Sequence, residues 1–358
     1  VRFAFCFPDT YEIGMSHLGM KILYSQFNAR DDIWCERVFA PWLDFEEVMR
    51  KNNIPLFALE SRDPIKDFDF IGFTLQYEMA YTNVLNMIDL AGIPLKSSER
   101  KDLAPLVVAG GPCACNPEPL ADFIDIFFLG EGEEVDLEVI DLYKQTKAEG
   151  KSKFEFLQLA AQIEGVYVPS LYSVDYNEDG TVSKINPSAN APAKIRKRII
   201  KNLDKSFYPD KFVVPYIEIV HDRAVAEVFR GCIRGCRFCQ AGQLYRPVRE
   251  RSVEFLKDLA IKLAKQHKNA KHVEEKGDEI IRYDVYGQEL KVGDLVFKHA
   301  AMATCIIEVD VITEFPPISK KKNSFGYDVM LYNPYTDKEE LGNILDLVKI
   351  QNPEKYIV

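Results

Sequence analysis

The sequence has no apolar run of the length that a membrane-spanning helix needs. Such a helix takes about 18–20 consecutive apolar residues, whereas the longest apolar runs, at 104–111 and 124–130, are much shorter. A charged and then apolar signal segment is also absent from the start, which opens on strand-like sequence at Val1. We therefore expect a soluble, cytoplasmic protein with no membrane partner, whose natural N-terminus precedes Val1.

Positive charge is scarce. The chain of 358 residues has a net charge of −10, which argues against the chain-wide basic surface typical of nucleic-acid-binding proteins. One basic run, from Lys194 to Lys201, is interpreted as a solvated linker, with nucleic-acid contact as the alternative. No Walker-type phosphate loop is present, and the five histidines are scattered without a neighbouring nucleophile. Average contents of hydrophobic (47%) and charged (28%) residues exclude disorder and coiled coil.

The first 150 residues alternate short apolar runs with segments of helical periodicity. We expect strands at 2–7, 34–39, 54–59, 68–74, 106–109 and 124–129, and helices at 14–27, 44–52, 77–91 and 134–149. Continuous apolar strands separated by helices indicate a parallel sheet that is covered on both faces. The sequence therefore predicts a doubly wound, flavodoxin-like α/β domain with a five-stranded parallel sheet over residues 1–150.

The loops that follow these strands are rich in glycine. In doubly wound sheets, ligands lie at the carboxyl ends of the strands, where small residues let backbone N–H groups approach them. The alternative is that these glycines only form tight turns. Four such loops at one edge favour a cofactor site, whose candidate residues are Asp9, Tyr11, Gly14, Gln76, Gly110, Gly111, Gly130, Glu131 and Gly132.

The rest of the chain divides into three segments. Residues 151–222 form a connector with a small β element, and residues 223–266 contain a strand, a cysteine-rich loop and a helix that Ser252 caps. Residues 267–358 are expected to be β-rich, with strands at 279–285, 294–297, 306–312 and 327–331 and a terminal helix at 337–350.

Cysteine is the most informative residue type. Three of the eight cysteines, Cys232, Cys236 and Cys239, form a C-x3-C-x2-C loop, a spacing that can bind three irons of a cubane cluster and leave the fourth open. Zinc is the alternative, but it needs a fourth cysteine or histidine. The remaining cysteines are placed at the rim (Cys113, Cys115) or in apolar strand-like sequence (Cys6, Cys35, Cys305).

The stretch from Arg230 to Gly242, RGCIRGCRFCQAG, resembles the signature loop of radical S-adenosylmethionine (radical SAM) enzymes. The N-terminal part resembles the cobalamin-binding-type domain that precedes the barrel in one branch of that superfamily, and residues 3–14, 68–91 and 107–133 resemble a bacterial group of these two-domain proteins. The resemblance covers about residues 1–266. It implies a [4Fe-4S] cluster on the three cysteines, with Phe238 near the adenine of S-adenosylmethionine and Gly242 beside the site.

The same resemblance implies a chemistry. An electron from the cluster cleaves the sulfonium bond of S-adenosylmethionine and gives methionine and a 5′-deoxyadenosyl radical. The expected outcome is methyl or methylthio transfer to RNA or a small molecule, with flavodoxin or ferredoxin as reductant. Cobalamin is a further expected cofactor.

Two departures from the family pattern keep an alternative open. The cobalamin motif Asp-x-His-x-x-Gly is matched only by Asp9 to Gly14, with Tyr11 in the histidine position; His17 lies just beyond and is interpreted as a capping or packing residue. A barrel of six strand–helix units of about 30 residues each does not fit the 135 residues from Ala224 onward. The alternative is a non-catalytic iron–sulfur or corrinoid-binding protein with an incomplete barrel.

Overall fold

The computed structural model describes residues 1–217, 219–221 and 225–265, with side chains to Lys262, and the backbone of seven further strands between 282 and 349. The chain forms two compact units. Unit 1 comprises Val1–Lys201 and Ser206–Pro209, and unit 2 comprises Asn202–Lys205 and Asp210–Val358. Among the described helices, none combines the length and apolar character needed to span a bilayer.

Unit 1 is built on a six-stranded sheet of order β2-β1-β3-β4-β5-β6. The first five strands run parallel, and β6 pairs antiparallel with β5 at one edge. The five parallel strands therefore confirm the predicted sheet, and the order 2-1-3-4-5 is that of flavodoxin-like folds. The strands are β1 (Arg2–Phe7), β2 (Trp34–Phe39), β3 (Phe70–Thr74), β4 (Leu106–Gly110), β5 (Ile126–Phe128) and β6 (Val166–Tyr167).

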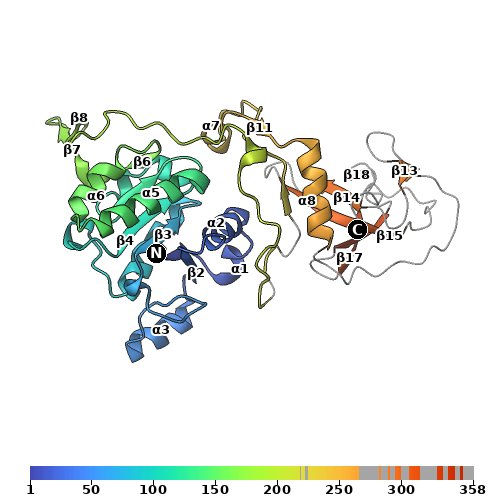
Figure 1. The fold of residues 1–358 in the computed structure, drawn as a ribbon, viewed down its shortest axis with the longest axis horizontal. Coiled ribbons are helices and arrows are strands. Elements are labelled where there is room, and N and C mark those ends of the chain that lie inside the picture. Colours follow the sequence, from blue (N-terminus) through green and yellow to red (C-terminus); the bar gives the residue numbers. More distant parts are fainter. Residues whose placement is uncertain are drawn as a thin grey trace. The chain divides into compact units, whose positions relative to one another are not determined.

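Helices cover both faces of this sheet, as Figure 1 shows. They are α1 (Tyr11–Gly14), α2 (Leu18–Asn28), α3 (Leu43–Asn52), α4 (Tyr81–Leu90), α5 (Gly132–Ala148) and α6 (Lys153–Ala160). Side chains alternate along β1, so that Phe3 packs against Phe27 of α2 at 4.9 Å between ring centroids, whereas Cys6 packs on the other face with α4. Each face thus has its own apolar core.

The predicted strand at 54–59 is wrong. This segment makes only an isolated bridge at Phe57, and the N–H of Leu59 donates to the carbonyl of Arg37 on β2. Glu60 then accepts from the Arg37 side chain at 2.7 Å. The apolar residues of the segment are buried by these contacts to β2 without a continuous strand ladder, and sequence periodicity does not distinguish the two cases.

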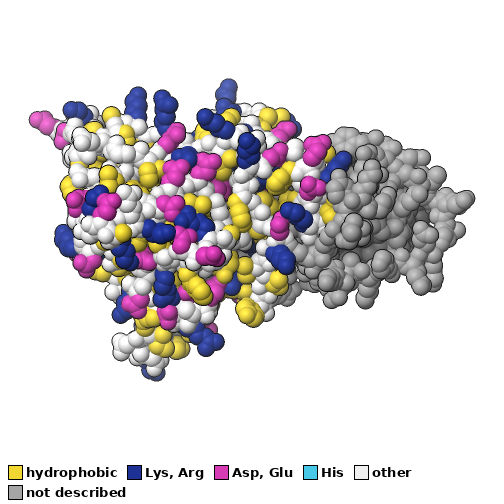
Figure 2. Space-filling view, viewed as in Figure 1, with side chains coloured by type: hydrophobic (Ala, Val, Ile, Leu, Met, Phe, Trp, Pro, Cys, Tyr) yellow, Lys and Arg dark blue, Asp and Glu magenta, His cyan; other side chains and the backbone are white. Residues whose placement is uncertain are grey.

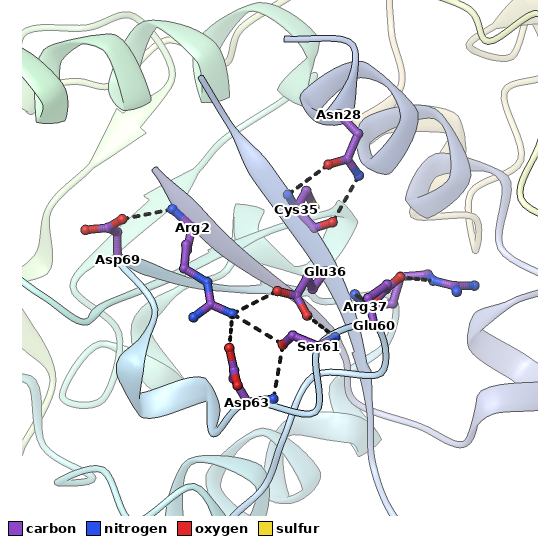
Figure 3. Close-up of polar contacts among 9 residues, drawn as sticks. All are labelled: Arg2, Asn28, Cys35, Glu36, Arg37, Glu60, Ser61, Asp63 and Asp69. Atoms are coloured by element: carbon purple, nitrogen blue, oxygen red, sulfur yellow. Dashed lines mark hydrogen bonds and ion pairs between the residues drawn. The ribbon is translucent and has the colours of Figure 1, made fainter. Parts of the chain in front are cut away.

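A buried carboxylate on β2 holds the loop that follows. Glu36 is fully buried and accepts from Arg2 at 2.9 Å and from the backbone N–H of Ser61 at 2.8 Å (Figure 3). Arg2 also pairs with Asp63 at 2.8 Å and lies over the ring of Phe68 at 4.0 Å. Because Glu36 is paired and hydrogen-bonded, its burial is tolerated in the core.

Unit 1 also contains most of the segment expected as a connector. Strands β7 (Tyr172–Tyr176) and β8 (Val182–Pro187) form an antiparallel hairpin after β6.

Charged side chains of both signs are interspersed over the described residues on the face that Figure 2 shows.

Unit 2 begins with the cysteine-rich segment. Its elements are β9 (Val225–Glu227), β10 (Phe229–Arg230), α7 (Ala241–Leu244), β11 (Arg249–Glu250) and α8 (Val253–Lys265). The predicted cap is confirmed, since the hydroxyl of Ser252 accepts from the N–H of Phe255 at 3.1 Å.

Seven strands follow α8, and the last two replace a predicted helix. They are β12 (Arg282–Tyr283), β13 (Glu289–Leu290), β14 (Leu295–His299), β15 (Ile306–Glu314), β16 (Val329–Asn333), β17 (Lys338–Gly342) and β18 (Leu347–Lys349). The predicted helix at 337–350 is wrong, because β17 and β18 occupy it. Cys305 lies outside the described residues.

Strand pairing in unit 2 differs from that expected at the start of a βα barrel. β9 pairs antiparallel with β15, which also pairs antiparallel with β14 and β16. Every strand pair that the structure describes in this unit is antiparallel. The order of strand, loop and helix at 225–265 resembles a βα unit in sequence, yet the partner strand that decides the sheet type comes from residues 306–308.

Candidate functional site

The carboxyl edge of the unit 1 sheet carries an apolar cavity. It has a volume of about 590 Å³ and is formed by the loops after β1 and β2 and by residues 56–59. Aromatic rings dominate its wall, with Tyr11 and Phe39 at 5.2 Å between ring centroids. Trp42 and Phe45, which also line it, are 67% and 45% exposed. Such exposure of large rings marks a surface that an apolar ligand can cover.

Several predicted rim residues meet beside this cavity. The hydroxyl of Tyr77 donates to Asp9 at 3.5 Å, which links the loops after β1 and β3. These two strands lie on either side of the point where the strand order reverses. Nε2 of Gln76 donates to Thr74 Oγ1 at 2.6 Å. A Cβ at Gly111 would lie 3.2 Å from the same Nε2 atom of Gln76.

Other predicted rim glycines have packing roles that the structure makes plain. A Cβ at Gly14 would lie 2.3 Å from the ring of Phe39, so glycine lets α1 pack on the sheet. Gly130, at φ +113°, bridges to Arg198, whose carbonyl would lie 2.1 Å from a Cβ there. The N–H of Glu131 donates to the same carbonyl at 3.1 Å.

The remaining predicted residues at this edge contact protein groups too. The carboxylate of Glu131 accepts from the N–H of Ile200 at 2.6 Å, the carbonyl of Gly110 accepts from the N–H of Leu75 at 2.7 Å, and a Cβ at Gly132 would lie 2.7 Å from Asp136 Oδ2. The chain segment at 198–200 therefore covers the loop after β5, and the open part of the rim is that after β1, β2 and β3.

Burial shifts the pKa values of three groups at this edge in the direction that favours their neutral forms. Burial lowers the pKa of His17 to about 4, although a hydrogen bond to Gln76 opposes it. Nδ1 of His17 accepts from the N–H of Met20 at 3.1 Å, which confirms the capping role. Burial raises the pKa of Cys113 to about 11, and burial with the nearby charge of Glu133 raises the pKa of Asp136 well above its usual value. An environment that disfavours charge surrounds this part of the rim.

The cysteine loop of unit 2 is closed at its base. β10 pairs with β11, so the residues at 231–248 leave and return through one short antiparallel ladder. Glu227, on β9, accepts from Arg230 at 2.8 Å and from Arg251 at 2.9 Å, and thereby ties both ends of the loop to one carboxylate. Arg251 also donates to the carbonyl of Leu203.

A glycine directs the chain from this base into the loop. Gly231 has φ +103°, and a Cβ there would lie 2.8 Å from the carbonyl of Tyr245. Only glycine adopts this conformation against such close backbone without strain. Gly242 is buried in α7, and a Cβ on it would lie 3.9 Å from Cys239 Sγ.

The three predicted cluster cysteines are accessible and unoxidised. Cys236 is exposed, Cys232 and Cys239 are half-buried, and all three are free thiols. Cys232 Sγ accepts from the N–H of Arg234 at 3.4 Å. Phe238 is 93% exposed beside them.

The donor chemistry of this loop fits an iron–sulfur cluster. Three thiols within eight positions on one closed loop are the ligand type that iron requires. Within the described residues, no three His, Cys, Asp or Glu side chains already converge on one point. Cluster binding on this loop thus requires the three thiols to gather.

Two sets of structural residues were missed by the sequence analysis. One is the Glu227–Arg251 pair at the loop base; the other is a buried network of Arg100, Asp125 and Lys153 in unit 1. Both join residues that are more than 20 positions apart, so local patterns carry no sign of them.

Comparison with known proteins finds a similarity to radical SAM proteins in part of this chain. Residues 19–169 match the family described as radical SAM proteins, N-terminal. The matched region lies in unit 1, and the cysteine loop lies outside it.

Two further similarities cover most of the chain. The uncharacterized protein MJ0966 of Methanocaldococcus jannaschii is 29% identical over 260 residues, which are 72% of this chain and 45% of that protein. The radical S-adenosylmethionine methyltransferase TsrM from Kitasatospora setae, solved with tryptophan substrate and an S-adenosylmethionine analogue, aligns with 74% of this chain and 46% of its own, at a TM-score of 0.40 and 13% identity. The chain spans about half the length of each.

Proposed function

We propose that this protein is a radical SAM iron–sulfur enzyme whose cluster is held by Cys232, Cys236 and Cys239. The observation that carries the proposal is the closed loop of unit 2, which carries three free thiols between the two strands of a short ladder. The family match supports it independently, because it rests on residues 19–169 and not on the cysteines.

The residues of the loop have distinct tasks in this proposal. Glu227 fixes the loop base by holding Arg230 and Arg251, and Gly231 sets the direction of the chain before the first cysteine. The chemistry that a [4Fe-4S] cluster supplies here is one-electron reduction of the S-adenosylmethionine sulfonium. Phe238, with its ring 93% exposed, offers an apolar face to the adenine.

Anaerobic reconstitution with iron and sulfide tests the proposal. The full chain is expected to gain the visible absorbance of a cluster and, after reduction, to form 5′-deoxyadenosine from S-adenosylmethionine. In Cys236→Ala the absorbance should fall to the background level. Cys115→Ala is the matched control, because Cys115 is also an exposed free thiol but lies in unit 1, and it should keep the cluster.

A second candidate function follows from the strand pairing of unit 2. Antiparallel pairing of β9 with β15 departs from a βα barrel and favours a non-catalytic iron–sulfur or corrinoid-binding protein. A cluster that forms without 5′-deoxyadenosine production supports this candidate and contradicts the first. No cluster in the wild-type protein contradicts the first candidate and the iron–sulfur form of the second.

Cobalamin, if bound, would lie at the carboxyl edge of unit 1, near Asp9, Tyr11, Gln76 and Gly111. Asp9, Tyr11 and Gln76 lie in the loops after β1 and β3, and Gly111 lies next to Gln76, whereas His17 already accepts a hydrogen bond through Nδ1. We expect hydroxocobalamin to co-elute with the protein in gel filtration. The complex should weaken in Tyr11→Ala, since Tyr11 forms part of the cavity wall. Co-elution that is unchanged in this variant contradicts the placement.

A further inference from the structure

A second cavity in unit 1 lies at the opposite edge of the sheet. It has a volume of about 740 Å³ and is lined by residues 96–101, which precede β4, by residues 118–123, which precede β5, and by parts of α6 and β7. Residues that precede parallel strands lie at their amino ends, whereas the rim described above lies at the carboxyl ends. The volume is within the range of small-molecule sites. One part of its lining carries four cations, Lys96, Arg100, Lys101 and Lys153, against the carboxylates Glu118 and Asp122, and another part is aromatic.

The cationic part rests on buried charges. Asp125 is fully buried and pairs with Arg100 at 3.1 Å and with Lys153 at 2.8 Å. The side chains of Arg100 and Lys153 are 3% and 8% exposed, and both residues line the cavity. Two cations share one carboxylate, so this group carries an excess positive charge that an anion in the cavity would balance.

Lys153 has a donor to spare. Its Nζ donates to Asp125 and, at 2.8 Å, to the carbonyl of Arg100. An ammonium has three N–H groups, and no acceptor for the third is found in the part of the chain that the structure describes. Burial lowers the pKa of Lys153, against the effect of Asp125. Lys96 and Lys101 add exposed positive charge to the same part of the lining.

The aromatic part is formed by Tyr167, which is 9% exposed, by Tyr172, which is half-buried, and by Tyr176. Tyr167 and Tyr172 lie 5.1 Å apart between ring centroids. The hydroxyl of Tyr167 donates to Glu118 at 2.6 Å, and that of Tyr172 donates to the carbonyl of Pro192 at 2.7 Å. Tyr176, which follows on β7, is 65% exposed. Flat aromatic ligands stack on such rings.

We infer that this cavity binds a nucleoside monophosphate, with the phosphate at Lys96, Lys101 and Lys153 and the base on the tyrosines. A phosphate matches lysine ammonium groups as point charges, and a nucleobase is the flat group that the tyrosine rings accept. All residues that line the cavity belong to unit 1, so we expect it to bind its ligand whether or not unit 2 holds a cluster.

Calorimetric titration of the full chain with AMP tests this inference. We expect a Kd below about 1 mM, with adenosine and inorganic phosphate each binding at least about tenfold more weakly. The double variant Lys96→Glu/Lys101→Glu should weaken the binding of AMP by about tenfold or more, because it replaces attraction of the phosphate by repulsion. Lys66→Glu is the matched control, because Lys66 is exposed in unit 1 outside the cavity lining, and it should leave the affinity unchanged.

Tyr176→Ala tests the aromatic part separately. The loss of one exposed ring should weaken AMP by about fivefold or more and leave the weak binding of phosphate unchanged. The inference is overturned if AMP gives no heat at about 10 mM, if adenosine binds as tightly as AMP, or if the double lysine variant keeps the wild-type affinity. Binding of a single-stranded oligonucleotide but not of AMP overturns it as well. Because the titration needs no iron, its failure is distinguishable from failure of cluster assembly.

Discussion

The two edges of the unit 1 sheet bury carboxylates in opposite ways. At the amino edge, Asp125 is surrounded by donors from Arg100, Lys153, Ser97 and the N–H of Val107. At the carboxyl edge, Asp136 is also buried, yet its Oδ1 has no hydrogen-bond partner among the described residues. Asp125 is thus buried together with two cations, whereas burial without such partners raises the pKa of Asp136 well above its usual value.

This difference extends to the ligands that each edge can take. At the carboxyl edge, His17 and Cys113 are neutral as well, and the cavity wall is aromatic. Such surroundings fit an apolar or neutral group. At the amino edge the excess positive charge fits an anion. In the sequence, glycine-rich loops indicate the carboxyl edge. The amino edge is formed by ion pairs between residues that are distant in sequence, which no local pattern indicates.

The removal of the Asp125 side chain has the largest expected effect on the free energy of unfolding. Asp125→Ala leaves Arg100 and Lys153 buried without their counter-ion, and should lower the free energy of unfolding by about 3–5 kcal/mol. Urea unfolding at neutral pH measures it. Asp122→Ala, an exposed neighbour in the same segment, is expected to stay within about 0.5 kcal/mol of the wild type. A loss for Asp125→Ala as small as that of Asp122→Ala would contradict the comparison.

A smaller effect is expected from His17 at the carboxyl edge. Its folded pKa of about 4 lies below the ordinary value of 6.5, so the unfolded chain binds more protons between these values. The stability that neutral His17 contributes is therefore complete above pH 6.5 and is lost as the pH falls toward 4. His17→Asn keeps a capping side chain. Between pH 6.5 and pH 4, its free energy of unfolding should fall by about 1–3 kcal/mol less than that of the wild type. Parallel pH profiles of the two proteins in urea unfolding would refute this assignment.

The smallest effect is a gain in stability. The raised pKa of Asp136 means that this residue destabilises the folded state increasingly as the pH rises above 3.8 toward the folded value. Asp136→Asn is neutral at every pH and should raise the free energy of unfolding by about 1 kcal/mol at pH 7. At a pH below 3.8 the two proteins should be alike. Thermal unfolding at both pH values measures the change, and an equal effect at the two would count against a buried proton on Asp136.

The sequence predicted what depends on local pattern. The parallel strands of unit 1 follow from continuous apolar runs, the cap of α8 follows from Ser252, and Cys6 and Cys35 are buried as expected. The three cluster cysteines remain a prediction that their spacing supports. What failed depends on partners that are distant in sequence. The segment at 54–59 is held by β2, and β17 and β18 form in sequence with an apparent helical period.

The site shows the same division. Spacing marked Cys232, Cys236 and Cys239, but only the fold reveals that Glu227 ties Arg230 to Arg251. Spacing also marked Gly130, and only the fold shows that Arg198 covers it.

The bridge between Gly130 and Arg198 has a consequence for the co-translational folding of the protein. All five parallel strands are made by residue 128, yet the loop after β5 receives its partner only when residue 198 has been translated. Until that segment leaves the exit tunnel, the backbone of Gly130 and Glu131 must bond to water. The parallel part of the nascent sheet is therefore complete well before its carboxyl edge is sealed, and a pause in translation within this interval would leave that edge open.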